Sequence, residues 1–450
     1  MGNTNPNWQN VKIRMTTRIT YKTVLAIAVP IMLSNLSEPL IGIVDTAVLG
    51  QLPQAYYIGA IAVASLIFSI VYWGFGSLRL GTGGLAAQAF GARQMTELRA
   101  VFARALLISS VIGIFIVALG PLIGDLSFWL FEASPEVERY ARIYFDIRIW
   151  SAPFALANYV ILGWFIGMGK TGHAFAVQLV LNLTNVALDI FFVLGLSMTA
   201  DGVAFGTLLA EIIAAAFGLL LVWRVLGQVG GRWSKKRTFD RAAILNTVSV
   251  NADIMVRSLL LTFAFGFFTA QSARAGDIII AANAILMHLL VTSAYFLDGF
   301  AVAVESLAGQ AVGAGNRARF WQTVKRTSVL GFAVSVLVSI VFALVGPLFI
   351  DLLTINETVR AAARTYLVWA VMAPVIGFAC FQLDGIFTGA TRSKDLRNMM
   401  IISVLAYLAV WYILAGPFGN NGLWASLMIF FIIRAITLAA RMPALLKALF

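Results

Sequence analysis

Charged residues, cysteine and histidine are scarce in this chain of 450 residues. Only 12% of the residues are charged, against about 25% in a typical soluble domain, and the mean hydropathy is +0.90. Cys380 is the only cysteine, so an intramolecular disulfide is excluded. With His173 and His288 as the only histidines, and with no HExxH motif, carboxylate cluster or nucleophile elbow, we expect neither an enzyme nor a bound cofactor.

Long apolar runs fill the chain from end to end. Each is long enough to cross a bilayer core as a helix, which takes about 20 residues, and the alternating pattern of a barrel strand is absent. Because a backbone in lipid must satisfy its own hydrogen bonds, we interpret every run as a helix. The expected spans are residues 24–50, 56–81, 100–123, 141–168, 174–197, 202–225, 243–270, 278–303, 322–345, 362–389, 398–416 and 422–441.

The basic residues lie in alternate loops. The loops between them, such as 51–56 and 416–422, carry few or none. This positive-inside pattern predicts that both termini are cytoplasmic and that the number of spans is even. It accounts for the net charge of +12 without a nucleic-acid partner. The basic residues are Lys12, Arg14, Arg18, Lys22, Arg93, Arg99, Lys170, Arg224, Arg232, Lys235, Lys236, Arg237, Arg241, Arg317, Arg319, Lys325, Arg326, Arg392, Lys394, Arg397, Arg441 and Lys447.

The second half of the chain repeats the first at a shift of 222 residues, from 84 to 306. Several matches at nearly one spacing and in one order indicate a duplicated unit of six helices. The matched segments are GLAAQAFGAR (84–93) with SLAGQAVGAG (306–315), FIGMGK (165–170) with FTGATR (387–392), Arg142 and Tyr144 with Arg364 and Tyr366, and GPLIGDL (120–126) with GPLFIDL (346–352), the last with four residues more in the first half.

The duplication predicts the architecture. Because six is even, both copies enter the membrane in the same direction, so we expect twelve transmembrane helices in two six-helix lobes related by a pseudo-two-fold axis along the membrane normal. The expected divisions are a cytoplasmic tail (1–23), a first lobe (24–225), a cytoplasmic linker (226–242) and a second lobe (243–450). The tail is too polar for a cleaved signal, so the first span is expected to remain as an anchor. Two such lobes typically enclose a cavity that opens to one side at a time, as in transporters.

One segment imitates a nucleotide site. GMGKTG, residues 167–172, is similar to a phosphate-binding loop, but Trp164 stands where that loop needs glycine, and the segment follows an apolar helix rather than a strand. We interpret it as a helix end with a basic residue at the cytoplasmic face, because Arg392 repeats Lys170 in the second half.

The first span carries acids on one face. Asn35, Glu38, Gly42 and Asp45 follow a 3, 4, 3 spacing, which places them on one side of a helix. An aspartate at a helix centre costs about 2.5–3.5 kcal/mol on insertion scales and rarely faces lipid. We therefore expect this face to line the interior of the first lobe.

A second polar stripe lies in the fifth span. Asn182, Asn185 and Asp189 recur at i, i+3 and i+7, and Thr207 and Asn158 of neighbouring spans are expected to point into the same space. Carboxylate, amide and hydroxyl oxygens suit either a proton, held because burial favours the neutral carboxyl group, or a sodium ion. The alternative is a structural role, in which these side chains only form hydrogen bonds between neighbouring helices. Glu38, for which no specific partner is evident, fits this alternative best.

Four segments of the chain resemble a known protein family. VPIMLSNLSEPLIGIVDTAVLGQL (29–52), AAQAFGAR, NLTNVALDI and LDGIFTGATR are similar to the multidrug and toxic compound extrusion (MATE) family, most closely to its DinF-like bacterial branch. The resemblance covers nearly the whole chain. It implies two six-helix lobes in the bacterial cytoplasmic membrane and cation-coupled export of amphipathic, often cationic compounds.

The resemblance also implies roles for single residues. It places the family's aspartate of the first helix on Asp45, the asparagine and aspartate of the fifth on Asn185 and Asp189, the threonine of the sixth on Thr207, the asparagine of the fourth on Asn158 and the bending proline of the first on Pro30. A coupling proton or a sodium ion is then expected at the site formed by Asp45, Asn185, Asp189 and Thr207. Glu38 departs from the family pattern.

The acids of the second half are harder to assign. Asp253, Asp298, Glu305 and Asp384 lie in or at the ends of the seventh, eighth and tenth spans, and another branch of the family uses acids on its seventh and tenth helices. Arg257 follows Asp253 by one helical turn and is positioned to neutralise it. These acids therefore stay open between site residues and structural ion pairs. The expected substrate cavity contains Asn35, Glu38, Asn158, Asp298 and Asp384.

Three classes of function remain, of which one leads. It is secondary active efflux of amphipathic drugs or metabolites by antiport with protons or sodium through alternating access, carried out by a monomer in the lipid bilayer. A flippase of lipid-linked precursors or an organic-anion exporter of the same broad superfamily is the alternative, less favoured because the buried charges are mostly acidic. A membrane enzyme comes last because it lacks a reacting constellation.

Overall fold

The computed structural model describes residues 19–50, 54–131 and 133–450, and the side chains of all of these except 38–49 and 55. The described residues form helices joined by short loops, with no strand among them. The helices are α1 (Tyr21–Leu49), α2 (Ala55–Trp73), η2 (Gly74–Gly76), α3 (Ser77–Gly91), α4 (Met95–Ala118), α5 (Gly120–Phe131), α6 (Pro135–Arg148), η3 (Ile149–Ser151), α7 (Ala152–Gly167), α8 (Thr171–Asp189), η4 (Ile190–Gly195), α9 (Ala200–Val229), α10 (Lys235–Thr238), α11 (Arg241–Arg274), α12 (Asp277–Gly313), α13 (Arg317–Leu353), α14 (Glu357–Gly389) and α15 (Ser393–Leu449).

The expected all-α membrane fold is confirmed. Ten helical segments of the described chain are long and apolar enough to cross a bilayer, and α1 adds a helix of 29 residues. α15 has 57 residues, about 85 Å at 1.5 Å per residue, far more than the roughly 30 Å of a bilayer core. Its backbone leaves the helical conformation at Gly419 (φ 51°, ψ −128°), between the expected spans 398–416 and 422–441, and this break divides it into the eleventh and twelfth helices.

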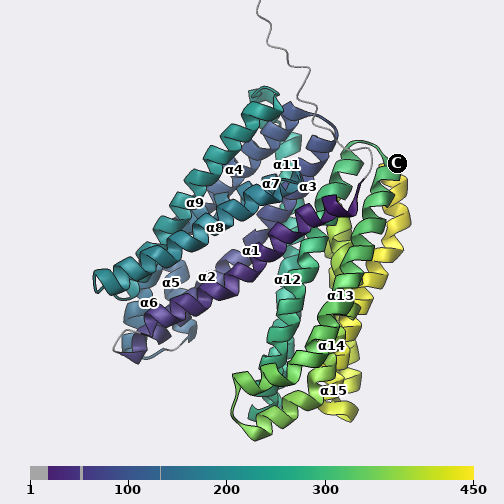
Figure 1. Ribbon diagram of the computed structural model, residues 1–450. Coiled ribbons are helices and arrows are strands. Elements are labelled where there is room, and N and C mark those ends of the chain that lie inside the picture. The colour runs from purple at the N-terminus through teal and green to yellow at the C-terminus, as the bar shows by residue number, and fades with distance from the viewer. Residues whose placement is uncertain (1–18, 51–53, 132) are drawn as a thin grey trace, which may run out of the picture.

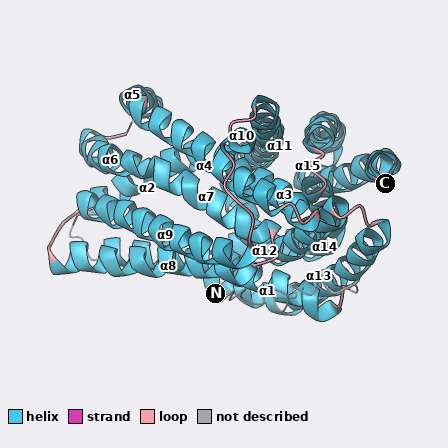
Figure 2. Ribbon diagram, turned by 90° about the horizontal axis from the view of Figure 1, so that it is seen from above, coloured by secondary structure: helices cyan, strands magenta, loops and turns pink. Residues whose placement is uncertain are grey.

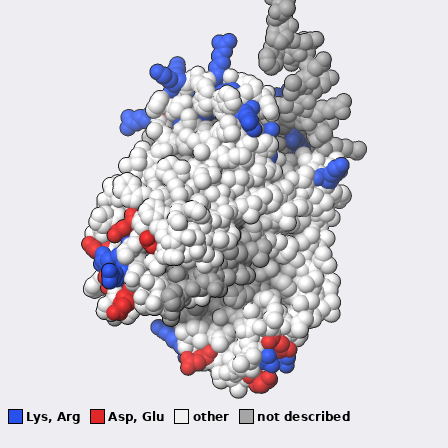
Figure 3. All heavy atoms as spheres, turned by 60° about the vertical axis from the view of Figure 1, so that its left-hand side comes forward, with Lys and Arg blue, Asp and Glu red and all other residues white. Residues whose placement is uncertain are grey.

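The helices form two groups that meet at one end of the molecule. Figure 1 shows α2 to α9 on one side and α12 to α15 on the other, in contact at the end that carries the C-terminus and diverging toward the opposite end. Seen along the perpendicular direction, α3 of the first group and α12 of the second lie near the centre, where the groups meet (Figure 2). Lys and Arg gather at the end where the groups meet, whereas the opposite end mixes both signs of charge (Figure 3). We call the former the basic end; it holds loops 92–94, 168–170, 314–316 and 390–392.

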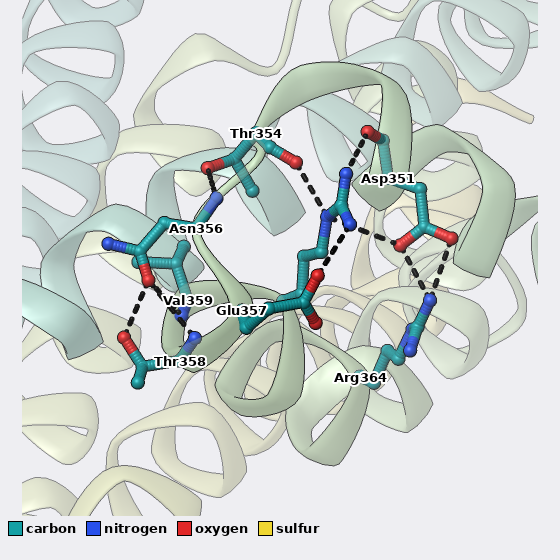
Figure 4. Close-up of polar contacts among 8 residues, drawn as sticks. Asp351, Thr354, Asn356, Glu357, Thr358, Val359 and Arg364 are labelled. Atoms are coloured by element: carbon teal, nitrogen blue, oxygen red, sulfur yellow. Dashed lines mark hydrogen bonds and ion pairs between the residues drawn. The ribbon is translucent and has the colours of Figure 1, made fainter.

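The repeated motifs make the same ion pair at the opposite end of both halves. Arg142 Nη1 lies 2.8 Å from Asp125 Oδ1 in the first half, and Arg364 Nη2 lies 2.6 Å from Asp351 Oδ1 in the second. Figure 4 shows the second copy, where Arg364 faces both oxygens of Asp351 beside the turn from α13 to α14. In that turn the Asn356 side chain accepts from the first backbone N–H groups of α14, as an N-cap does. The matched sequences therefore occupy matched places in space.

Several expected span limits are wrong, for local reasons. The expected span 100–123 is two helices, because α4 ends at Ala118 and Pro121, which has no backbone N–H, stands at the start of α5 (Gly120–Phe131). The expected span 56–81 continues to Gly91 through the short turn η2. Hydropathy marks the part of a helix that contacts lipid and not its ends. The length of a helix that projects beyond the bilayer is therefore underestimated from the sequence.

α1 packs against both groups. Val24, Ile27 and Ala28 of its first part form a buried cluster with Phe300 and Leu307 of α12. Farther along, Asn182 Nδ2 of α8 donates to Ser37 Oγ of α1 (2.8 Å). The first helix therefore crosses the boundary between the two groups.

Candidate functional site

The polar residues predicted in the fifth and sixth spans come together at the end of α8. Asp189 is the last residue of α8 and is 0% exposed. Its carboxylate lies against Gly206 of α9, where an added Cβ would collide with Oδ1. One turn earlier, Asn185 Nδ2 donates to Thr207 Oγ1 (3.3 Å), and this hydroxyl donates to Val203 O (3.1 Å). The chain continues from Asp189 into the π-helix η4, a distortion that is frequent at functional sites.

Two predicted residues of the first span lie where only the backbone is described. Asp45 and Glu38 belong to α1, but their side chains are outside the described residues. The bond from Asn182 to Ser37 places α1 beside α8. The helix that carries Asp45 therefore runs along the helix that carries Asp189.

Asn158 bonds to a carboxylate that the sequence analysis missed. Its Nδ2 donates to Glu211 Oε2 (2.7 Å) and to Glu211 O (3.2 Å). Glu211 lies one turn after Thr207 on α9, so the polar stripe of that helix is longer than predicted. Arg148 of α6 acts electrostatically on Glu211 and donates to Tyr144 Oη (2.6 Å). The signal was present, because Glu211 is an acid inside the expected span 202–225, the same criterion that selected Asp189.

Asn35 and Asp298 meet where the two groups of helices touch. Asn35 Nδ2 of α1 donates to Asp298 Oδ2 of α12 (3.4 Å), and Arg79 Nη2 of α3 lies 4.0 Å from the same oxygen. The Asp298 and Arg79 side chains stay 36% and 28% exposed. The three side chains therefore present a polar, accessible surface between the groups.

Two further acids of the second half, Asp384 and Asp253, form ion pairs with arginines. Asp384 Oδ2 accepts from Arg257 Nη1 (3.0 Å) and from Arg434 Nη2 (2.6 Å), and Arg434 is only 3% exposed. Asp253 accepts from Arg397 Nη1 (2.6 Å) and Ser393 Oγ (2.9 Å). The expectation that Arg257 neutralises Asp253 is wrong, because a pair one turn apart on a helix contributes only about 0.2–0.5 kcal/mol and Arg257 reaches the partly buried Asp384 instead.

An apolar cavity also lies between α3, α4 and α11. It has a volume of about 410 Å³ and is lined mainly by apolar side chains of α3, α4 and α11, among them Leu78, Leu107, Val111 and Met255, with one amide, Asn251. Cavities of this size, apolar with few polar groups, fit drug-sized ligands.

Comparison with known proteins identifies the family. The MatE family model matches residues 30–191 and 254–413. "DNA damage-inducible protein F" of Escherichia coli (strain K12) is 38% identical over 93% of this chain and 91% of its own. "Multidrug export protein MepA" of Staphylococcus saprophyticus is 22% identical over 91% of this chain and 90% of its own.

The fold agrees with that match. A solved structure described as "Outward-facing conformation of a multidrug resistance MATE family transporter of the MOP superfamily" superposes with a TM-score of 0.84 at 19% identity, covering 95% of this chain and 97% of that one. The resemblance noted in the sequence is thus confirmed. The chain belongs to the MatE family of multi-pass membrane transporters.

Proposed function

We propose that the chain exports amphipathic, often cationic compounds in exchange for protons by alternating access. The observation that carries the proposal is Asp189, a fully buried carboxylate beside Asn185 and Thr207. A carboxylate in the membrane interior costs about 2.5–3.5 kcal/mol on insertion scales and marks an ion or substrate pathway. Asp45 of α1 is the proposed second carboxylate of this site, and Asn35, Glu38, Asn158, Asp298 and Asp384 are proposed to face the substrate.

The distribution of charge supports an orientation. Basic loops face the cytoplasm in membrane proteins, so we place the basic end and both termini there. The lobes, 24–225 and 243–450 with the linker 226–242, are then closed toward the cytoplasm and diverge toward the outside. A single chain supplies both lobes, which supports a monomeric transporter in the bacterial cytoplasmic membrane.

The contacts of Thr207 favour a proton over sodium as the coupling ion. A sodium ion needs several oxygen ligands at once, and one of the two lone pairs of the Thr207 hydroxyl is already taken by the Asn185 amide. A proton needs only the carboxylate. Sodium is the alternative that the experiment decides.

The decisive experiment is transport in proteoliposomes loaded with a cationic dye, with the proton and sodium gradients imposed separately. Export driven by the proton gradient alone is the expected result. Export that requires sodium would replace the proton, and no export under either gradient would contradict the proposal.

The buried arginines favour organic-anion export as a second candidate. Arg257 and Arg434 share the single carboxylate of Asp384, and the Nε of each is buried with no hydrogen-bond partner in the described part of the chain. Two guanidinium groups against one carboxylate suit an anionic substrate. Proteoliposomes loaded with an anionic dye therefore form the second arm of the experiment.

A further inference from the structure

The two lobes are joined at the basic end by a symmetric pair of hydrogen bonds. Gln88 Nε2 of α3 donates to Gly389 O at the end of α14 (3.1 Å) and to Thr391 Oγ1 (3.0 Å). Gln310 Nε2 of α12 donates to Gly167 O at the end of α7 (3.1 Å). Gln88 and Gln310 are separated by 222 positions, as are Gly167 and Gly389. We call this contact between the lobes the seal.

Paired glycines let the backbones touch across and around the seal. An added Cβ on Gly91 would collide with the Gln310 carbonyl, and one on Gly313 would collide with the Gln88 carbonyl. These glycines again differ by 222 positions. The close approach of α3 and α12 thus follows from the small residues of the sequence LAxQAxGA, which both halves share at 85–92 and 307–314.

Glu305 breaks this symmetry. The position 222 residues earlier is Gly83, and Glu305 Oε1 lies 2.5 Å from the place where a Cβ of Gly83 would stand. Glu305 is 3% exposed, and Oε1 is buried with no hydrogen-bond partner among the described residues. One lobe therefore inserts a carboxylate into the space that the other lobe leaves by having no side chain.

Glu305 has no ion pair among the described residues, because the arginines near it pair with other carboxylates. Arg79 of α3, Arg257 of α11 and Asp298 of α12 act on it electrostatically. Arg79 lies beside Asp298 instead. Arg257 forms an ion pair with Asp384 of α14, and Arg434 of α15 forms a second ion pair with the same carboxylate. α7 contributes backbone, with Gly163 O near the same space. A buried carboxylate with no direct partner is costly when ionised.

We propose that Glu305 is a second proton-binding site and that the seal closes over it only when its carboxylate is protonated or neutralised by a bound cation. The inference rests on the proposed proton-coupled export and adds the group that links the proton to the movement of the lobes. Opening the seal exposes Glu305 to cytoplasmic water, where it releases the proton. During the return movement a bound cationic substrate compensates the negative charge of Glu305, so the seal can close. On the outer side the substrate leaves, and a proton reaches Glu305 past the accessible Asp298 and replaces it.

The inference makes closure of the seal depend on pH. Because one proton is taken up on closing, the ratio of closed to open molecules rises by up to about tenfold for each pH unit lost. Nitroxide labels on Gln94→Cys and Lys394→Cys, both exposed at the basic end and one in each lobe, report the separation by pulsed electron resonance. The purified chain is measured in lipid nanodiscs without substrate, and Cys380 stays in place because it is buried.

Two variants and a control separate this role from a structural one. Glu305→Gln keeps the shape and removes the charge, so its ratio of closed to open molecules is expected to be high and not to change with pH. Gly83→Ala inserts a methyl group against Oε1, so the flexible Glu305 side chain has to move out of this space and the closed fraction is expected to be lower than in the parent at every pH. Glu136→Gln, an exposed acid of the opposite end, is expected to follow the parent.

The inference is overturned if the parent distance does not change with pH, or if Glu305→Gln keeps the parent's pH dependence. Because the distances need no gradient or substrate, their outcome is independent of the transport assay. Sodium-driven export together with a seal that follows pH through Glu305 would refute the proposed coupling ion and leave this inference standing. Proton-driven export with a pH-insensitive seal would do the reverse.

Discussion

At the scale of single residues, the main feature of the first lobe is the isolation of Asp189 from water. The carboxylate is packed against a glycine, Gly206, and Asn185, one turn earlier on the same helix, bonds to Thr207 of α9. Such an environment makes the charge state of the aspartate sensitive to whatever cation enters. If proton and cationic substrate both use this carboxylate, binding of one weakens attraction for the other.

Asp189→Asn tests this competition. In the parent, the affinity for a cationic dye is expected to fall by up to about tenfold for each unit by which the pH is lowered, over the range in which the site takes up its proton. The isosteric amide cannot titrate, so the variant should bind the dye weakly and with little dependence on pH. Binding is measured by fluorescence polarisation on purified protein, with Asp277→Asn, an exposed acid of the opposite end, as the control. An undiminished pH dependence in Asp189→Asn would place proton and substrate in separate sites.

Sequence reasoning finds residues of this kind but not their partners. The rule that an acid inside a span is functional selected Asp189 and would have selected Glu211, had it been applied to every span. It could not pair Arg257 with Asp384, because the two are 127 positions apart and meet only through helix packing. It also could not single out Glu305, since the relevant fact is that Gly83 of the other lobe leaves room for it.

At the scale of elements, α1 is the helix best placed to couple the site to movement. Its first part packs on α12 and its later part bonds to α8, with Pro30 between them. Pro30 has no N–H to donate to the carbonyl four residues before it, and that carbonyl, Ala26 O, instead accepts from Thr171 Oγ1 of α8 (3.3 Å). The helix is continuous through Pro30 in this conformation. Pro30 is therefore a position at which α1 can bend in another conformation.

Pro30→Ala should stiffen this helix. The alanine N–H restores the bond to Ala26 O, and bending then costs that hydrogen bond, about 1 kcal/mol. The expected result is a fall in turnover of about fivefold, with dye affinity unchanged, measured by initial rates of export and by binding. Val29→Ala, next to it and exposed, serves as the control. Full turnover in Pro30→Ala would show that α1 moves without bending at this residue.

Elements were predictable where the sequence carries a local cause. The number of helices follows from the apolar runs, and the breaks follow from Pro121 and Gly419, which are visible in the sequence. The continuation of α3 to Gly91 was not predicted, since small and polar residues there are held helical by contact with α12 rather than by lipid. Tertiary contact decides such ends.

At the scale of the whole molecule, two nearly symmetric lobes carry unequal chemistry. The first holds the buried Asp189, whereas the seal between the lobes holds Glu305 opposite Gly83. Symmetry gives the two halves a common surface on which to rock, and the departure from it gives that surface a group that responds to protons. Two carboxylates at different places then allow two protons to enter in each cycle.

The number of protons makes a prediction about driving force. Exchange of two protons for one monovalent cation carries one positive charge inward, which gains about 2.3 kcal/mol per 100 mV of membrane potential, equivalent to about a 50-fold substrate gradient. Proteoliposomes loaded with a monovalent cationic dye should therefore export it under an inside-negative potassium diffusion potential with no pH gradient, compared with protein-free vesicles.

Glu305→Gln should change this dependence without abolishing transport. With one proton site left, the exchange becomes one for one and moves no net charge, so the potential alone should drive no export, while a pH gradient should still drive it at a reduced rate. The measurement is the initial rate of dye release under each gradient, with Glu136→Gln as the matched control. Export by Glu305→Gln that still follows the potential would mean that the second charge enters elsewhere, and Glu211, bonded to Asn158 in the first lobe, would be the carboxylate to test next.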